Sequence, residues 1–270
     1  MQITAEQLSR QLEEGVRDVY QSGRYQDHLK AVSRFHKYSW GNTILILSQK
    51  PEATYVAGYH TWNTDFNRHV RRGEKAIRIL TPVLRKEDDD ADSERKLCGF
   101  RCSSVFDISQ TDGEEIPLFL AETLNFQIKD YQSFINALLL VSPVPVSFED
   151  VKHANGYYHP LEKRICIRTD LPQAQTVKTL IHEITHAMLH STDTSADHGS
   201  RQRREIEAES VAYIVSARFG IDTSSYSFGY IASWAEDRST ELLKTSLDTI
   251  QKTASKLIFL LECVLFPAKA

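Results

Sequence analysis

The spacing of hydrophobic residues changes along the chain, and each spacing predicts a type of secondary structure. Over residues 4–36, apolar positions recur every three to four residues, which predicts two helices, the first with Thr4 as its N-cap. Another helix is expected over about 39–50, before a proline. Residues 54–83 have the texture of β-strands punctuated by glycine and proline, and a strand resumes over 100–107.

The second half of the chain returns to helical spacing after one more group of strands. A helix is expected over about 131–140, a strand around 144–148, and a hairpin over 157–168. Three longer amphipathic segments predict helices at roughly 174–191, 203–219 and 237–264. This order of helices and strands predicts an α+β protein.

Two short segments and one boundary complete the predicted organisation. The acidic run Glu87–Glu94 predicts an exposed loop, and Gln110–Gly113 predicts a turn. A domain join is expected near residues 120–128, which gives a small α/β domain at 1–125 and a second domain at 126–270.

Composition places the chain among ordinary globular proteins. Hydrophobic residues make up 41% and charged residues 25% of its 270 residues, enough to form a core. No apolar run reaches the length of about 18 residues that a membrane span needs, so no membrane partner is expected. Because the first residues are polar and the four cysteines form no CxxC pair, we expect a cytoplasmic protein with reduced thiols.

The strongest chemical signal is the segment His182-Glu183-Ile-Thr-His186 inside a predicted helix. Two histidines four residues apart lie one turn apart on the same face, so both imidazoles can reach one cation. The glutamate between them can take a proton from a water bound to that cation. The segment therefore predicts a zinc site with His182 and His186 as ligands and Glu183 as the catalytic base.

The third ligand is expected from the following acidic helix. Glu205 and Glu209 are four residues apart and share a face with small residues that allow close packing. We assign Glu205 as the ligand and Glu209 as the carboxylate that orients a ligating histidine, with the reverse assignment left open. His198 is a further alternative, whereas His190 lies about 12 Å along the helix from His182, too far to share the metal.

Residues around the predicted hairpin are candidates for substrate binding. The strand Arg164–Arg168 can either pair with an extended peptide as an edge strand or only support the metal helix. Tyr157, Tyr158 and Tyr230 are candidates for stabilising a developing oxyanion, and nothing in the sequence ranks them.

Charge is distributed unevenly along the chain. Between Arg24 and Lys86 there are twelve basic and four acidic residues, a net charge of +8, which leaves −12 for the rest of a chain whose total is −4. A basic region in an acidic protein indicates an anionic partner.

Aromatic residues are interleaved with these basic residues, a combination that suits single-stranded DNA because rings stack on bases and cations follow the phosphates. Most of the aromatic residues should nevertheless belong to the core, and Trp40 and Trp62 in particular can be packing residues. The residues that we predict to contact DNA are Lys37, Trp40, Asn42, Trp62, Arg68, Arg71, Arg72 and Lys75.

Two sets of motifs resemble one known family. The first half contains Phe35-x-x-Tyr38-Ser-x-x-Asn42, Gly58-x-x-x-Trp62, Gly73-Glu74-Lys75 and Phe106-Asp107-x-x-Gln110-Thr111. These motifs resemble the N-terminal domain of ArdC-type antirestriction proteins. The second half, with its His-Glu-x-x-His helix, Glu205 to Tyr213 and Tyr226 to Trp234, is similar to their metallopeptidase domain and to ImmA/IrrE-like peptidases.

The resemblance implies a single-stranded-DNA-binding domain followed by a zincin-like metallopeptidase domain, a combination typical of plasmids and other mobile elements. It also implies Glu205 as the third ligand. The expected function is that of a DNA-binding zinc metallopeptidase acting in antirestriction or on DNA-associated proteins. Two alternatives are a non-catalytic antirestriction protein with a structural zinc and a regulatory protease that cleaves one repressor. Oligomeric state and the protein or peptide substrate are not predicted.

Overall fold

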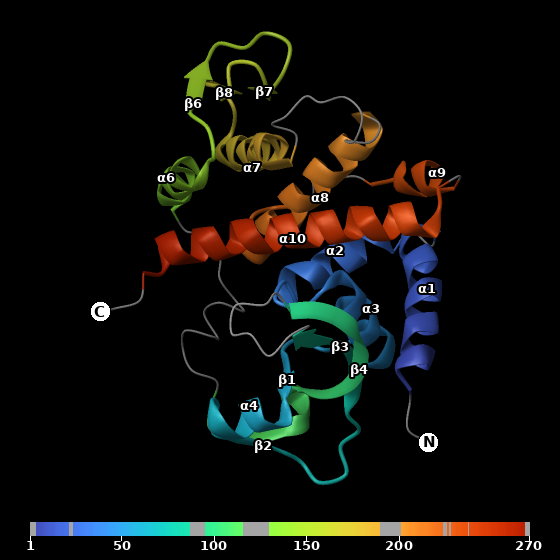
Figure 1. Cartoon of the computed structure of the whole chain (residues 1–270). Coiled ribbons are helices and arrows are strands. Elements are labelled where there is room, and N and C mark those ends of the chain that lie inside the picture. The colour runs from blue at the N-terminus through green and yellow to red at the C-terminus, as the bar shows by residue number, and fades with distance from the viewer. Residues whose placement is uncertain are drawn as a thin grey trace. The chain divides into compact units, whose positions relative to one another are not determined.

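A computed structural model of the chain describes residues 4–21, 24–86, 95–115, 130–189, 201–223, 226, 228–236 and 238–267. The chain divides into two compact units. The N-terminal unit comprises Met1–Val19 and Trp40–Ala121, and the C-terminal unit comprises Tyr20–Ser39 and Glu122–Ala270. Figure 1 labels most elements of both units. In the described residues, every helix is too short or too polar to cross a membrane.

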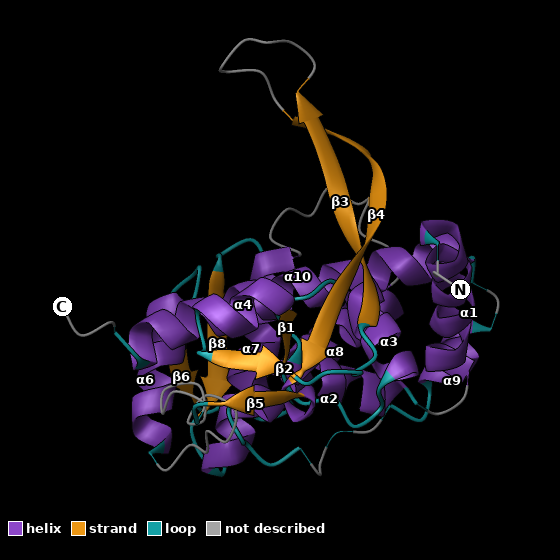
Figure 2. Cartoon of the chain, turned by 90° about the horizontal axis from the view of Figure 1, so that it is seen from below, coloured by secondary structure: helices purple, strands orange, loops and turns teal. Residues whose placement is uncertain are grey.

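The N-terminal unit combines short helices with two antiparallel sheets. The strands β1, β4 and β3 form one sheet in the order β1-β4-β3, and β2 pairs with β5 in the other. Figure 2 shows β3 and β4 as two long strands side by side, and they pair in antiparallel orientation. The elements are α1 (Ala5–Gln21, whose last two residues belong to the C-terminal unit), α3 (Trp40–Gln49), β1 (Val56–Gly58), α4 (Tyr59–Thr64), β2 (Arg68–Val70), β3 (Ile77–Lys86), β4 (Arg95–Asp107), η1 (Ile108–Gln110) and β5 (Thr111–Gly113).

Helix α1 begins as the sequence predicts. The Thr4 hydroxyl accepts a hydrogen bond from the backbone N–H of Gln7, and the Gln7 side chain accepts one from the backbone N–H of Thr4. This reciprocal pair is a capping box, which satisfies two of the backbone donors that a helix start leaves without partners.

Helix α3 is attached to strand β3 through two amide side chains. Asn42 donates to the carbonyl of Leu80 and accepts from its N–H, each at 2.9 Å. Gln49 makes the same pair of bonds with the backbone of Arg78, each at 2.8 Å. These side chains therefore act as a partner strand would, and they satisfy backbone groups on the side of β3 that does not face β4.

A network of polar side chains joins the segments that precede β1 and β3 to the end of β4. The buried Asp107 carboxylate accepts from the backbone N–H groups of Thr54 and Tyr55. Gln110 accepts from the N–H of Asp107 and donates to Glu74, whose carboxylate also accepts from Arg71. Motif residues from two distant segments thus have a structural role, because Glu74 of one segment supplies an acceptor to the buried Gln110 of the other.

The C-terminal unit packs helices around a three-stranded sheet of order β6-β8-β7, in which β6 is parallel and β7 antiparallel to β8. Helix α7 packs on β7 and β8 and against α8, and α8 also contacts α2 and α10. The elements are α2 (Tyr25–Arg34), α6 (Tyr131–Val141), β6 (Val146–Glu149), β7 (Gly156–His159), β8 (Arg164–Arg168), α7 (Gln173–Leu189), α8 (Arg201–Arg218), α9 (Ile231–Ala235) and α10 (Thr240–Leu265).

Helix α2 is part of the C-terminal unit although it precedes most of the N-terminal unit in sequence. The buried hydroxyl of Tyr25 lies 2.7 Å from the Ser210 hydroxyl on α8, and its ring lies against Tyr20 and Phe228. Residues 20–39 thus complete the core around α8. The domain ranges 1–125 and 126–270 stay a prediction about the two family domains, since the compact units group the chain differently.

Most predicted elements are confirmed, including all three long helices of the second half and the hairpin. Two predictions are wrong. Tyr59–Thr64 is a helix inside a segment predicted as β, and this helix buries Trp62 in contact with Tyr55 and Phe66. Thr111–Gly113 is a strand paired with β2 instead of part of a turn. The predicted loop Glu87–Glu94 lies outside the described residues.

Candidate functional site

Helix α7 places three predicted site residues on adjacent turns. His182 and His186 are half-buried, and their Nε2 atoms lie 3.1 Å apart, as the four-residue spacing predicts. Glu183 is buried beside them. The apolar side of the same helix, including Leu180, Ile181 and Ile184, is fully buried. Core packing therefore determines which side of α7 presents the two imidazoles.

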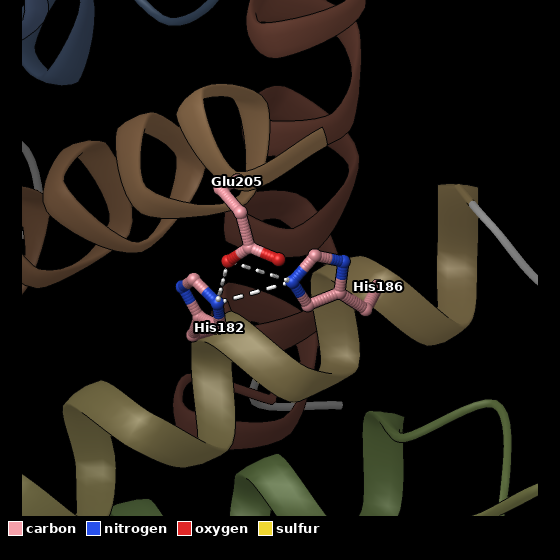
Figure 3. A group of neighbouring side chains, drawn as sticks. All are labelled: His182, His186 and Glu205. Atoms are coloured by element: carbon pink, nitrogen blue, oxygen red, sulfur yellow. Dashed lines mark hydrogen bonds and ion pairs between the residues drawn. The ribbon is translucent and has the colours of Figure 1, made fainter. Parts of the chain in front are cut away.

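Helix α8 supplies a carboxylate to this pair of imidazoles. The Glu205 Oε2 atom lies 3.4 Å from the His182 Nε2 and 3.7 Å from the His186 Nε2 (Figure 3). Four-coordinate ligation at about 2.0–2.2 Å from a metal separates donor atoms by roughly 3.3 Å. The observed separations bracket this value, so His182, His186 and Glu205 form a group that could hold a metal ion.

A second carboxylate on α8 holds the outer nitrogen of His182. The Glu209 Oε2 lies 3.3 Å from the His182 Nδ1, and its Oε1 lies 3.1 Å from the Lys178 ammonium group. Lys178 also lies over the Tyr226 ring, 3.8 Å from its centroid. A carboxylate on the outer nitrogen fixes the orientation and tautomer of a ligating imidazole.

The electrostatics of this group favour a positive charge. Burial lowers the pKa of His182, but its hydrogen bonds to the Glu205 and Glu209 carboxylates outweigh burial and raise that pKa well above its usual range. Hydrogen bonds from His182 and from His186 hold the pKa of Glu205 below its usual range. A site that attracts a proton so strongly also suits a cation.

Glu183 has the environment of a base. Burial raises the pKa of its carboxyl group, and the neighbouring imidazoles of His182 and His186 and a backbone hydrogen bond from Tyr158 reduce that shift. Glu183, Glu205 and both histidines line a cavity of about 490 Å³ whose other walls are formed by residues of β7, the turn after it and the first turn of α8.

The tyrosine candidates occupy different positions. Tyr157 and Tyr158 line the cavity, and the buried Tyr158 hydroxyl has no hydrogen-bond partner among the described residues. Tyr230 is 40% exposed, and burial together with the Glu209 and Glu205 charges raises the pKa of its phenol. His190 and His198, weighed as ligands from the sequence, lie outside the described residues.

Of the two roles left open for Arg164–Arg168, the peptide-pairing edge is wrong. These residues form β8, which lies between β6 and β7 and therefore pairs on both sides. The strand that lines the cavity is β7, and the described part of the chain pairs it on one side only. Sequence reasoning placed both strands of the hairpin but could not give their order in the sheet.

Half of the residues predicted to contact DNA instead make structural contacts within the N-terminal unit. Trp62 is completely buried and its indole N–H donates to the Phe106 carbonyl, so its assignment as a stacking residue is wrong. Asn42 bonds the backbone of β3, as described above. Arg68 donates to the hydroxyl and carbonyl of Thr111, and Arg71 donates to Glu74 and Asp112. These two arginines join β2 to β5.

The other predicted contacts are accessible. Arg72 and Lys75 are exposed on either side of Gly73, whose positive φ of 90° turns the chain between β2 and β3. Trp40 is half-buried at the start of α3. Lys37 is exposed and belongs to the C-terminal unit.

Sequence reasoning missed three residues at the metal centre. Lys178 was detectable, because it precedes His182 by four residues and therefore lies on the same side of α7. Arg201 and Arg204 line the cavity and precede Glu205 by four residues and by one. The four-residue spacing from Glu205 could have indicated Arg201, because it places both residues on one side of α8. The cavity itself depends on tertiary structure.

Comparison with known proteins agrees with both halves of this description. The profile of the N-terminal domain of anti-restriction factor ArdC matches residues 1–106. The profile of the IrrE N-terminal-like domain, of peptidase family M78, matches residues 141–226, which include β7, α7 and the α8 carboxylates. By this combination of domains, the chain is an ArdC-type protein. The α+β fold with a zincin-like second domain, expected from the sequence, is confirmed.

Solved structures and a curated relative extend the likeness along the chain. The metal-free crystal structure of the antirestriction ArdC protein from the R388 plasmid has 21% identity and a TM-score of 0.53, covering 84% of this chain and 85% of that one. The Mn(II)-bound structure of the same protein has 20% identity and a TM-score of 0.51, covering 86% of each chain. An uncharacterised protein of Bacillus anthracis is 26% identical over 84% of this chain, which spans 46% of that longer protein.

Proposed function

We propose that this ArdC-type protein is a metal-dependent peptidase whose N-terminal unit binds single-stranded DNA. The observation that carries the peptidase part is the convergence of His182, His186 and Glu205 around one point, with the buried Glu183 beside them. The match to the M78 peptidase profile over the same residues supports it.

The proposed ligands are His182, His186 and Glu205, and the proposed cation is Zn²⁺, because two imidazoles and one carboxylate are a donor set typical of catalytic zinc. The Mn(II)-bound structure of the R388 protein supports a divalent cation. When bound, such a cation would lower the pKa of a water molecule and polarise the scissile carbonyl.

The side chains divide the remaining work. Glu183 would accept the proton of the attacking water on its carboxylate and pass it to the leaving amide nitrogen. Glu209 would hold the imidazole of His182 in position through its Nδ1, and Lys178 would hold Glu209. Strand β7 would bind the peptide backbone, since it lines the cavity and one of its sides has no partner strand among the described residues.

The test is cleavage of a protein crosslinked to single-stranded DNA by the wild type and by Glu183→Gln at equal metal content. Loss of a general base costs about 10²- to 10⁴-fold in rate. We therefore expect cleavage by the wild type and none by the variant, with the metal content measured by plasma mass spectrometry. Equal cleavage by both would eliminate Glu183 as the base, and absence of cleavage by the wild type would eliminate the peptidase function.

A non-catalytic antirestriction function is a second candidate, favoured by the match of residues 1–106 to a domain of an anti-restriction factor. It predicts that Glu183→Gln protects DNA from restriction as well as the wild type does. Protection that is lost with Glu183→Gln would instead require peptidase activity. Measuring transfer of unmodified plasmid DNA into a restricting host distinguishes the two.

The DNA-binding part of the proposal now rests on the accessible basic residues. Arg72→Gln combined with Lys75→Gln should weaken binding of an oligothymidylate and lower the slope of log affinity against log salt by about 1.4, roughly 0.7 for each phosphate that the variant no longer neutralises. Lys256→Gln, an exposed change in the C-terminal unit, is the control. Unchanged affinity and slope in the double variant would remove these residues from the DNA interface.

A further inference from the structure

Two arginines in the first turn of α8 face the cavity of the metal centre. Arg201 is exposed and Arg204 half-buried, and both line the cavity with Glu183, Glu205 and the two histidines. Residues three and four apart lie on one side of a helix, so Arg201, Arg204 and Glu205 share the side of α8 that faces the proposed ligands.

These arginines differ from the other two arginines that α8 carries. Arg203 donates to the buried Glu207 carboxylate at 2.7 Å, and Arg218 donates to Glu262 at 2.6 Å. Neither Arg201 nor Arg204 has a side-chain hydrogen bond or ion pair with any residue in the described part of the chain. Glu205 does not neutralise them, since its carboxylate is directed to the two imidazoles. Within the described residues, Arg203 and Arg218 thus have carboxylate partners, whereas the guanidinium groups of Arg201 and Arg204 lie at the cavity.

We propose that Arg201 and Arg204 form an anion-binding subsite that holds an acidic side chain of the peptide substrate next to the metal centre. A guanidinium group presents several N–H donors in a planar fork that matches a carboxylate, and it stays charged at any physiological pH. Two guanidinium groups on the same side of a helix also repel each other, so a bound carboxylate relieves that repulsion. The subsite selects substrates that carry Asp or Glu near the scissile bond.

The part of the cavity wall formed by β7 favours a peptide over a nucleic acid. Gly156, Tyr157 and Tyr158 of β7 line it, and the antiparallel pairing with β8 directs alternate backbone groups of β7 away from β8. An extended peptide can add to such an edge while one of its side chains reaches α8. A phosphate backbone has no N–H and C=O groups with the strand spacing that this wall recognises.

The inference rests on the proposed peptidase function, and a binding measurement tests it separately from cleavage. Fluorescein-labelled decapeptides of mixed sequence are synthesised in pairs that differ only by Asp against Asn or Glu against Gln. Metal-loaded Glu183→Gln is titrated into each peptide and binding is followed by fluorescence anisotropy. In the pairs that discriminate most, we expect the acidic peptide to bind about tenfold more tightly than its amide counterpart. This is the effect of one hydrogen bond between charged groups.

Arginine variants identify the source of that preference. Adding Arg201→Gln and Arg204→Gln should reduce the ratio of the two affinities to about one, whereas adding Arg238→Gln, an exposed arginine that does not line the cavity, should leave it unchanged. Folding is checked by the unchanged metal content and melting temperature of each variant. A preference that survives in the arginine double variant would overturn the inference.

Two further results separate this inference from the proposed function. Wild-type cleavage of both members of every pair at equal rates would overturn the acidic subsite and leave the peptidase proposal standing. A tenfold preference in binding without cleavage by the wild type would uphold the subsite and overturn the peptidase proposal. If the arginine double variant lost affinity for an oligothymidylate but showed no change with the peptides, the anion would be a phosphate and the inference would be wrong.

Discussion

At the scale of single residues, Glu209 connects the proposed metal ligands to the rest of α8. Its carboxylate lies between the His182 imidazole and the Lys178 ammonium group, 3.3 and 3.1 Å away. Removing its charge should lower metal affinity about 10- to 100-fold, because the imidazole loses the group that orients it. Competition with a chromophoric chelator measures this for Glu209→Gln, and the exposed Glu236→Gln serves as the control. An affinity equal to that of the wild type would show that His182 needs no such support.

His28 is a second residue with a measurable consequence. It is buried in α2, its Nε2 has no hydrogen-bond partner among the described residues, and burial lowers its pKa to about 4. In the unfolded chain its pKa is about 6.5. The unfolded state therefore binds the proton more readily, so the stabilisation is complete above pH 6.5 and falls as the pH drops toward 4, by about 3 kcal/mol in total.

Urea unfolding at pH 7.5, 6.5 and 5.5 with a chelator present tests this prediction for α2. Between pH 6.5 and 5.5, His28→Gln should lower the dependence of the free energy of unfolding on pH by about 1 kcal/mol per pH unit. The variant can be less stable at every pH, and the comparison uses only the slope. Parallel slopes for wild type and variant would mean that His28 titrates normally in the folded protein.

At the scale of elements, the approach of α7 to β7 depends on the absence of a side chain at residue 156. A Cβ atom on Gly156 would lie 2.8 Å from the Thr179 Cγ2 and 2.9 Å from the Cys166 carbonyl oxygen, closer than atoms pack. The glycine thus permits the close approach that brings the cavity wall beside His182 and Glu183.

Gly156→Ala should destabilise the protein by about 1–3 kcal/mol, the usual cost of overpacking. Gly229→Ala is a matched control in the same unit, because a Cβ atom there meets nothing within 4 Å. Thermal unfolding of both variants gives the comparison. Adding Thr179→Ser, which removes the closest methyl group, should restore part of the loss. Equal stability of the two alanine variants would show that α7 shifts away at little cost.

At the scale of the whole molecule, the C-terminal unit includes a segment that precedes most of the N-terminal unit in sequence. Residues 20–39 belong to the C-terminal unit, where Tyr25 contacts Ser210 of α8, the helix that carries Glu205 and Glu209. A fragment that begins at residue 126 lacks this segment. We expect such a fragment to expose the α2-facing side of α8 and to bind less than one metal ion per chain.

A rearranged chain provides the matched comparison for that fragment. Joining residues 20–39 to residues 122–270 through a glycine–serine linker should restore a cooperative thermal transition and a metal content of one ion per chain, because α2 is then again available to α8. Circular dichroism and metal analysis measure both. If the fragment from residue 126 folds and binds metal without the added segment, α2 is dispensable for the C-terminal unit.

The candidate metal centre was largely predictable because its residues are close in sequence. His182, Glu183 and His186 lie within two turns of one helix, and periodicity alone places them on one side of it. Glu205 was chosen from the same periodicity in the next helix, and the structure brings its carboxylate within 3.7 Å of both imidazoles. The predicted helices were recoverable for the same reason, since the apolar pattern that forms a helix is local.

Side-chain partners far apart in sequence were not predictable. Arg68 and Arg71 look like phosphate contacts in a basic window, yet they bond β5 and the turn before it, about 40 residues later in the chain. Trp62 and Asn42 were assigned to DNA contact from residue type. In the structure Trp62 lies in the core, and Asn42 bonds the backbone of β3. The same residue types serve structure or binding, and only the neighbours decide between them.

Local pattern alone therefore determined the longer helices, the hairpin and the histidine–glutamate side of α7, because the atoms involved are within a few residues of each other. The tertiary structure decided the strand order that puts β7 at the cavity, the transfer of α2 to the C-terminal unit and the exposure of Arg72 and Lys75. It also decided that Arg201 and Arg204 line the cavity of the candidate metal centre, without partners among the described residues. These features depend on which surfaces, distant in sequence, pack together. The packing that forms is the one that minimises the free energy of the whole chain, so no single segment determines it.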